Sequence, residues 1–332
     1  MASRVTARLA LLALVAALAA PTAHAAHRDA AVGVDALVFS SDGLTLAVGS
    51  SDGAVRFWDL PTGRQVDATL AGGGGAALPI AFSRDGHTLF GSIGDGVSAW
   101  DVEAGKEQGA AFAHGEAAIS FDRRTLAVAD PTAGGTIALW NTTTHGRTAT
   151  LEQSGGPWRA LALSGDGKTV AAAGSRGLVI WDARTHRRIG EPVDAGGHVV
   201  GIAFSPDGRT IALSDARGVR LWSIAKQTYA IPVLGPGKNA ALTKGTSIVV
   251  FSPDGGELVT VGTQGIFFWD PRNGKQVAPE LTKAGPGSEI TAFAFGPNGL
   301  NFATGTRDGH ASIWTRIGHV LIGGPFAAKP GP

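Results

Sequence analysis

The sequence predicts an all-β chain built from seven repeated units, and three observations support this. Seven of the eight tryptophans recur at gaps of 42, 40, 41, 41, 47 and 45 residues, namely Trp58, Trp100, Trp140, Trp181, Trp222, Trp269 and Trp314. Short runs of β-branched and aromatic residues precede each of them, as expected of strands. Glycine-containing turn signals separate these runs. A repeat of about 40 residues of this kind indicates one blade of a β-propeller, so we expect a single seven-bladed β-propeller.

Each repeat is expected to form one four-stranded antiparallel sheet, because three turns connect four short strands. Blade five shows the pattern in IAFSPDGRTIAL at 202–213. In its first turn, Pro206 pre-sets φ, Asp207 can bond the turn backbone and Gly208 tolerates positive φ. Blade three departs most from this pattern, with FDRRT at 121–125. One such sheet cannot bury both faces by itself, and seven packed around an axis bury one another.

The domain organisation follows from the repeat. We expect a leader at 1–25 and one propeller at 26–332, without an internal linker. The blades are expected at approximately 34–70, 77–112, 116–151, 158–193, 199–233, 246–281 and 289–326. Residues 318–326 resemble the outer strand of the other blades, so the last blade should own four strands and the ring should close without strand exchange.

The repeat resembles the WD40 family. The relevant pattern is a run like AFSPDG followed by a Gly turn and a strand ending in Trp-Asp, and Asp59, Asp101, Asp182 and Asp270 keep that ending. The resemblance covers almost everything after the leader. It implies structural roles for the seven periodic tryptophans, for the turn aspartates Asp52 and Asp308, which would bond the turn backbone and the tryptophan, and for His198 of the Gly-His pair.

The N-terminus has the pattern of a secretory signal peptide. Arg4 and Arg8 precede an apolar run over Leu9–Ala20, and a small-x-small tripeptide ends at Ala25. This run is shorter than the roughly 20 residues needed to span a bilayer. We therefore expect cleavage after Ala25 and a secreted or extracytoplasmic protein, with an uncleaved N-terminal anchor as the alternative.

Composition narrows the possible partners and chemistry. The chain has no cysteine, which excludes thiol catalysis and thiolate metal sites. Two of its 28 Lys and Arg residues lie in the leader, so 26 would remain against 27 Asp and Glu. A nearly neutral chain has no global attraction to nucleic acid or to an anionic membrane. We expect no nucleic-acid partner, no membrane span after cleavage, no cofactor and a monomer.

Function in such a ring is expected at the face that carries the entry loop and the second turn of each blade. Counting back from each blade's first-turn Phe or its equivalent gives a small and mostly neutral rim: Asp35-Ala36, Leu78-Pro79, Ala117-Ala118, Arg159-Ala160, Val200-Gly201, Ser247-Ile248 and Thr291-Ala292. Neither a ring of carboxylates nor a His cluster appears there, so no catalytic or metal site is predicted.

Two groups of residues are the candidates for partner binding, together with Asp35 of the rim. Trp158 is the one off-period tryptophan, and it either anchors a partner or fills the apolar position that Val199 occupies in the next blade. A basic arc on one face would comprise Arg159, Arg176, Arg217, Lys238, Lys244 and, in the turn of blade seven, Arg307. The arc could receive an acidic peptide or glycan, and the alternative is a set of scattered, solvated charges.

The function that fits these observations is a secreted, non-catalytic scaffold that binds a protein or peptide through loops on one face. Rigid display of short loops loses little conformational entropy on docking. The alternative is an extracytoplasmic propeller hydrolase, lactonase-like, with a site at the mouth of the channel. Such an enzyme would need convergent acidic and amide ligands.

Overall fold

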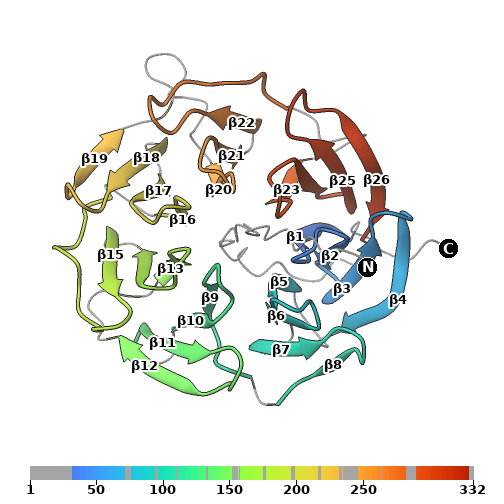
Figure 1. The fold of residues 1–332 in the computed structure, drawn as a ribbon, viewed down its shortest axis with the longest axis horizontal. Helices are drawn as coiled ribbons and strands as arrows, with labels where there is room; N and C mark the ends of the chain where they lie inside the picture. The colour runs from blue at the N-terminus through green and yellow to red at the C-terminus, as the bar shows by residue number, and fades with distance from the viewer. Residues whose placement is uncertain are drawn as a thin grey trace, which may run out of the picture.

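The computed structural model describes residues 32–328 except 72–75, 94–95, 110, 132–133, 152–155, 157, 175–176, 196–198, 216–217, 232–233, 235–245, 263 and 282–288. In this part of the chain, seven antiparallel sheets are arranged around a common axis (Figure 1). The prediction of an all-β seven-bladed propeller is confirmed. The leader predicted at 1–25 lies outside the described residues.

The strands follow one another in chain order within every blade. Blade one contains β1 (Val34–Phe39), β2 (Thr45–Ser50), β3 (Ala54–Asp59) and β4 (Arg64–Ala71), and blade two contains β5 (Leu78–Phe82), β6 (Thr88–Ser92), β7 (Val97–Asp101) and β8 (Lys106–Glu107). Blade three contains β9 (Glu116–Ile119), β10 (Thr125–Asp130), β11 (Thr136–Asn141) and β12 (Arg147–Leu151), and blade four contains β13 (Trp158–Leu163), β14 (Thr169–Gly174) and β15 (Gly177–Asp182). Blade five contains β16 (Gly201–Phe204), β17 (Thr210–Asp215), β18 (Gly218–Ser223) and β19 (Thr228–Ile231), and blade six contains β20 (Thr246–Phe251), β21 (Leu258–Gly262) and β22 (Gly265–Trp269). Blade seven contains β23 (Ile290–Phe295), β24 (Asn301–Thr306), β25 (His310–Thr315) and β26 (Leu321–Ala327).

Blades four and six correct the expectation of four regular strands in every blade. Their outer segments touch the third strand only at isolated bridges, Leu178 with Val193 and Trp181 with Arg188 in blade four, and Ile266 with Leu281 and Trp269 with Gln276 in blade six. Each segment carries a proline between its two bridging residues, at 192 and 279. Proline has no N–H to donate, so it interrupts the ladder.

The first turn of each blade is fixed by its own residues. In blade one, the Ser40 hydroxyl donates to Asp42 at 2.6 Å and accepts from the Thr45 N–H at 2.9 Å. The same Ser–Asp pairing recurs in blades two to six. The next residue adopts positive φ, and in six blades it is glycine, with φ between 67° and 81°. The spacing of Ser, Asp and Gly in the sequence therefore encodes this turn locally.

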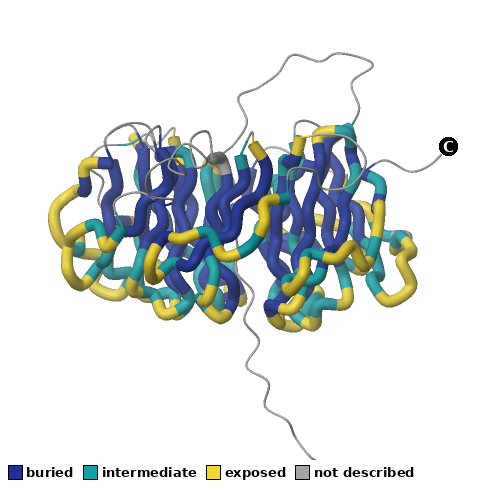
Figure 2. The backbone as a smooth tube through the Cα atoms, turned by 90° about the horizontal axis from the view of Figure 1, so that it is seen from above, coloured by how far each residue is buried: buried dark blue, intermediate teal, exposed yellow. Residues whose placement is uncertain are grey.

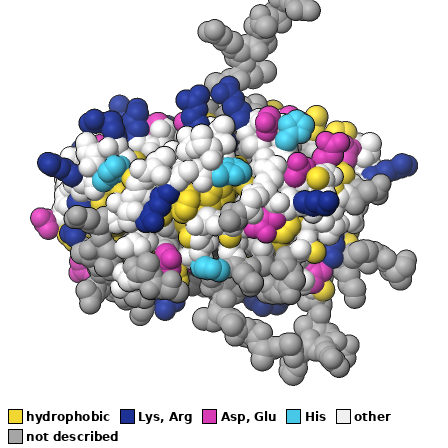
Figure 3. Space-filling model, turned by 90° about the horizontal axis from the view of Figure 1, so that it is seen from below, with side chains coloured by type: hydrophobic (Ala, Val, Ile, Leu, Met, Phe, Trp, Pro, Cys, Tyr) yellow, Lys and Arg dark blue, Asp and Glu magenta, His cyan; other side chains and the backbone are white. Residues whose placement is uncertain are grey.

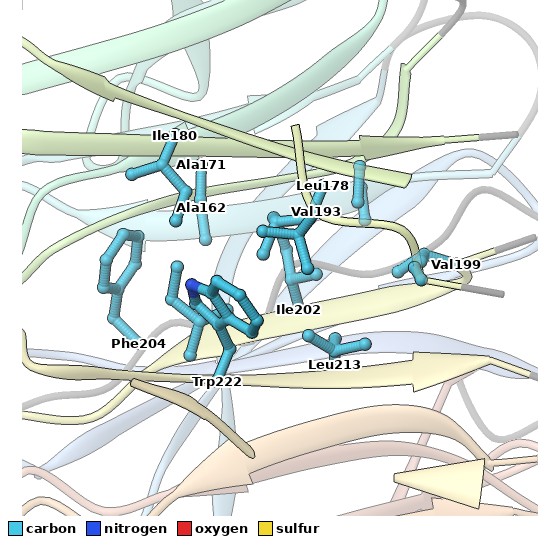
Figure 4. Packing of buried hydrophobic residues seen from close by; sticks show 14 residues of the cluster. Ala162, Ala171, Leu178, Ile180, Val193, Val199, Ile202, Phe204, Leu213 and Trp222 are labelled. Atoms are coloured by element: carbon cyan, nitrogen blue, oxygen red, sulfur yellow. The ribbon is translucent and has the colours of Figure 1, made fainter. Parts of the chain in front are cut away.

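The core consists of seven separate clusters, one at each junction between neighbouring blades. Each cluster contains one periodic tryptophan, which packs against the preceding blade. At the junction of blades four and five, Trp222 lies among Phe204 and Ile202 of its own blade and Ile180 of blade four (Figure 4). The tryptophans therefore recur in the sequence once for each junction between blades. Seen edge-on, buried strand segments run between the two faces of the disc, and exposed turns lie on its faces and along its outer edge (Figure 2).

The ring closes where blade seven meets blade one. β26 pairs with β25, so blade seven owns all four strands and, among the described residues, no strand is exchanged. The Thr291 hydroxyl donates to the Val34 carbonyl at 2.5 Å, and the rings of Trp58 and Phe326 lie 5.2 Å apart. A Cβ on Gly309 would lie 2.2 Å from the Val32 carbonyl oxygen, so this close approach requires glycine. The expected closure by packing of whole blades agrees with this arrangement.

Candidate functional site

The innermost strands β1, β5, β9, β13, β16, β20 and β23 surround the axis of the ring (Figure 1). Where these strands begin, the pairing register shifts by one residue in several blades. In blades one, four, six and seven the skipped residues are Asp35, Arg159, Ser247 and Thr291, all first members of the predicted rim pairs. In blade two the skipped residue is Ile80, which follows the predicted pair. A β-bulge leaves one residue outside the ladder and re-aims its side chain. Bulges therefore place Asp35, Arg159 and Thr291 outside the ladder on this rim, which we call the entry rim.

Asp35 has the most unusual electrostatic environment of the entry rim. Burial is the main cause that raises the pKa of its carboxyl to about 6, the charge of Arg307 opposes the rise, and the charge of Asp52 adds to it. Its Oδ2 atom is buried and has no hydrogen-bond partner. A partly buried carboxyl with a pKa near neutrality can exchange a proton or receive a donor from a ligand.

Arg307 is the cation whose charge acts on this carboxyl. It is exposed, its Nη2 atom lies 2.7 Å from Glu289, and its backbone N–H donates to the Glu289 carbonyl at 2.9 Å. Asp35, Glu289 and Arg307 thus form a small group of mixed charge where blades one and seven meet. An exposed pair of this kind adds little stability and is free to exchange its partner for a ligand group.

Trp158 does not form a surface anchor. Its side chain is 7% exposed, its Nε1–H donates to the Gly135 carbonyl at 2.6 Å, and its ring meets Trp181 edge-to-face at 5.7 Å between centroids. It opens β13 as Val34 opens β1, in a buried apolar position. The apolar alternative describes this residue, and the proposed anchor is corrected. The neighbouring Arg159 is exposed at the bulge, so it remains available to a partner.

The remaining members of the predicted basic arc, Arg176, Arg217, Lys238 and Lys244, lie outside the described residues, as does His198. The structure therefore brings Asp35 together with Arg307 and places Arg159 on the same rim, in blade four.

Blade three departs from the predicted rim. Ser120 bonds Asp122, which places Ser120 in the turn and Ile119, not Phe121, in the core. Counting back from Ile119 puts the rim pair of this blade at Gly115-Glu116, two residues before the expected Ala117-Ala118.

Asp52 bonds the turn backbone as expected, and both turn aspartates pair with side chains of residues other than tryptophan. Asp52 accepts from the Ala54 N–H and the Ser50 hydroxyl, and its Oδ2 lies 2.7 Å from Arg56 Nη2. Asp308 accepts from the Thr306 hydroxyl at 2.5 Å and lies 3.3 Å from His310 Nδ1. The expectation of an Asp–Trp bond is corrected, because Trp58 Nε1 is buried without a partner.

A hydroxyl on the second strand decides whether each indole finds a partner. Each periodic tryptophan pairs across the ladder with a residue of the second strand, for example Trp269 with Leu258. Two residues after that partner, on the same face of the sheet, the seven blades carry in order Val48, Gly91, Val128, Ala172, Leu213, Thr260 and Thr304. Trp269 and Trp314 donate to the two threonines at 2.9 Å each. Trp58, Trp100, Trp140 and Trp222 face residues without a hydroxyl there, and their indole nitrogens are buried without partners.

The opposite face carries a cavity that sequence reasoning missed. It has a volume of about 700 Å³ and lies between blades two and three, at their first turns and at the third turn of blade three. Among its lining residues are Arg84, Arg123, Arg124, Asp122 and His145. The signal was present in FDRRT, where arginine occupies the position of the turn glycine. Within the described ranges, no group of three or more His, Cys, Asp and Glu side chains is placed to hold a metal ion.

No helix that the structure describes has both the length and the apolar character needed to cross a membrane.

The fold and the repeat define a class, the seven-bladed propellers of the WD40 type, and the sequence comparisons agree. The model for the WD domain, G-beta repeat, matches residues 21–59 and 279–315. The model for outer membrane protein assembly factor BamB matches residues 122–294, more than half of the chain. The chain therefore belongs to the family of outer membrane protein assembly factor BamB. The prediction of a WD40-type propeller is confirmed.

A single stretch also resembles a characterised eukaryotic protein. Autophagy-related protein 16 of Arabidopsis thaliana is 29% identical over 152 residues, which is 44% of this chain and 30% of that protein. The match thus spans less than a third of the length of that relative.

Proposed function

We propose that this protein is an extracytoplasmic, non-catalytic scaffold that binds a protein or peptide at the entry rim. The observation that carries the proposal is the closed ring itself. Seven buried clusters lock the blades together, and each cluster contains residues of two neighbouring blades. Loops on such a ring are held in fixed register, so a partner is met without a large entropic cost.

The comparisons support the same function. WD40 propellers generally bind protein partners, and the matching family is described as an assembly factor. The leader pattern of the sequence favours a location outside the cytoplasm. This agrees with the family, whose description names outer membrane protein assembly. The proposed partner contacts are the exposed Arg159 and the group of Asp35 with Arg307.

The experiment is a comparison of charge reversals on the two faces of one blade. Arg159→Glu at the entry rim should reduce capture of partner proteins from cell-envelope extract by about tenfold or more, because a central Arg that loses its contact costs at least about 1.4 kcal/mol. Arg187→Glu is the matched control, since Arg187 is exposed in the third turn of the same blade. Equal capture by both variants and the wild type would rule out the entry rim as the binding face.

A hydrolase is the second candidate, and one observation favours it. The raised pKa of Asp35 is that of a carboxyl suited to general base chemistry near neutral pH. Lactone and ester hydrolysis by the wild type and by Asp35→Asn tests this directly. Activity that Asp35→Asn abolishes would replace the scaffold by an enzyme, and equal background rates in both would exclude Asp35 as a base.

A further inference from the structure

The cavity between blades two and three is built around an arginine that is costly to the fold. Arg123 occupies the turn position that glycine holds in the other six blades. Its φ is 61°, in the left-handed region that disfavours side chains with a Cβ. Gly86, at the same position in the adjacent blade, has φ 81°, and a Cβ there would meet only open space. The sequence therefore keeps arginine where glycine would satisfy the backbone.

Arg123 is costly for a second, independent reason. It is 8% exposed, and its Nη1 atom is buried without a hydrogen-bond partner. No carboxylate among the described residues lies within ion-pairing distance of it. A buried, unpaired guanidinium is strongly unfavourable. Burial lowers the pKa of Arg123 to about 10, so the group still carries its charge at neutral pH.

The backbone holds this arginine firmly in place. The Arg123 N–H donates to the Ser120 carbonyl at 3.0 Å, and the Arg123 carbonyl accepts from the Thr142 hydroxyl at 2.5 Å. Thr142 N–H in turn donates to the Arg124 carbonyl at 3.1 Å. The first and third turns of blade three are thereby tied together, and they form one wall of the cavity. Strain that is fixed by its surroundings is typical of ligand sites.

The charges of the lining residues define the ligand. The lining contains three arginines, Arg84, Arg123 and Arg124, and two aspartates, Asp85 and Asp122, so it carries one net positive charge. The Oδ1 atoms of both aspartates already accept bonds from their own turns. A single negative charge balances this lining, whereas a dianionic phosphate would leave one negative charge beside two aspartates. Lys and Arg side chains gather along one edge of the disc in the view of Figure 3.

We infer that this cavity binds a carboxylate, with the guanidinium of Arg123 as its anchor. A planar fork of N–H donors matches a carboxylate bidentately, and a cavity of about 700 Å³ has the size of sites that take small ligands or peptide side chains. The site lies on the face opposite the entry rim and does not depend on the scaffold proposal. Its ligand is a free carboxylate or the side chain of Glu or Asp in a peptide.

Calorimetric titration of the full chain tests the inference. The probes are N-acetylglutamic acid α-amide, the blocked tripeptide Ala-Glu-Ala, its Ala-Gln-Ala counterpart and inorganic phosphate. We expect the two Glu probes to bind and the Gln tripeptide to bind at least tenfold more weakly. Tighter binding of the tripeptide identifies a peptide ligand, and equal binding identifies the free carboxylate. Binding of phosphate in preference to both Glu probes would overturn the assignment.

The decisive variant is Arg123→Gly, which installs the residue of the other six turns. We expect it to lower the affinity for the Glu probes at least tenfold while its melting temperature stays equal to or rises above that of the wild type. Arg209→Ala, which removes an exposed arginine from the first turn of blade five, is the matched control and should bind as the wild type does. Unchanged binding by Arg123→Gly would overturn the assignment of Arg123 as the anchor. A fall in its melting temperature would overturn the argument that this arginine is kept at a cost to the fold.

Discussion

Replacement of Thr260 by Val tests the account of the tryptophans most directly. Trp269 and Thr260 are both 0% exposed, and the indole N–H donates to the Thr260 hydroxyl at 2.9 Å. The variant keeps the volume of the side chain and leaves a buried indole N–H without a partner. Such a loss costs about 1–3 kcal/mol of unfolding free energy. Valine recovers part of this by removing a buried hydroxyl, so we expect a net loss of about 1–2 kcal/mol.

A double-mutant cycle separates the hydrogen bond from packing. In a Trp269→Phe background there is no indole N–H, so Thr260→Val should cost little, and the coupling energy from urea unfolding should be about 1 kcal/mol. Thr260→Ser keeps the hydroxyl and should retain the coupling. A coupling energy below about 0.3 kcal/mol would refute the assigned role of the hydroxyl.

The remaining predictions concern buried charges and one buried ring. Asp35→Asn should stabilise the fold at pH 7 by about 1–2 kcal/mol after allowance for its partial exposure. Burial raises the Asp35 pKa to about 6, so the stability linked to the protonated carboxyl is present below about pH 4 and is lost as the pH rises through 6. The unfolding free energies of wild type and variant should therefore diverge over that range in urea titrations at several pH values. Arg220→Met should cost about 3–5 kcal/mol in the same assay, because it leaves the Asp215 carboxylate, 0% exposed, without its cation, and the double variant with Asp215→Leu should recover most of that loss. Trp158→Ala should lower the unfolding free energy by about 3–5 kcal/mol, because the ring is 7% exposed and packs on Trp181, and a melting temperature like that of the wild type would contradict this core position.

The fold was predictable because its information is local and repeated. The Ser-x-Asp-Gly turn is closed by its own side chains, as in Ser40 and Asp42, and the tryptophan period equals the period of the blade junctions. The prolines at 192 and 279 did not by themselves predict the two irregular outer segments, because β26 contains Pro325 and still pairs with β25. In blades four and six the outer segments form isolated bridges with the third strand.

The candidate site was predictable only in part. Asp35 and Arg159 were found because the distance from a core position to the rim is constant along a strand, and bulges at both residues keep them outside the ladder. The burial of Trp158 depends on Gly135 and Trp181, which are distant in sequence, so the sequence left two alternatives open. Arg123 was missed because an arginine in a turn normally indicates a solvated charge, and only the cavity shows that it is enclosed.

The side-by-side contact of β1 and β23 makes the seam of the ring equivalent to every other junction. Each blade is one continuous segment of chain, so joining residue 328 to residue 32 and cutting in another inter-blade connection should give a circular permutant with the same disc.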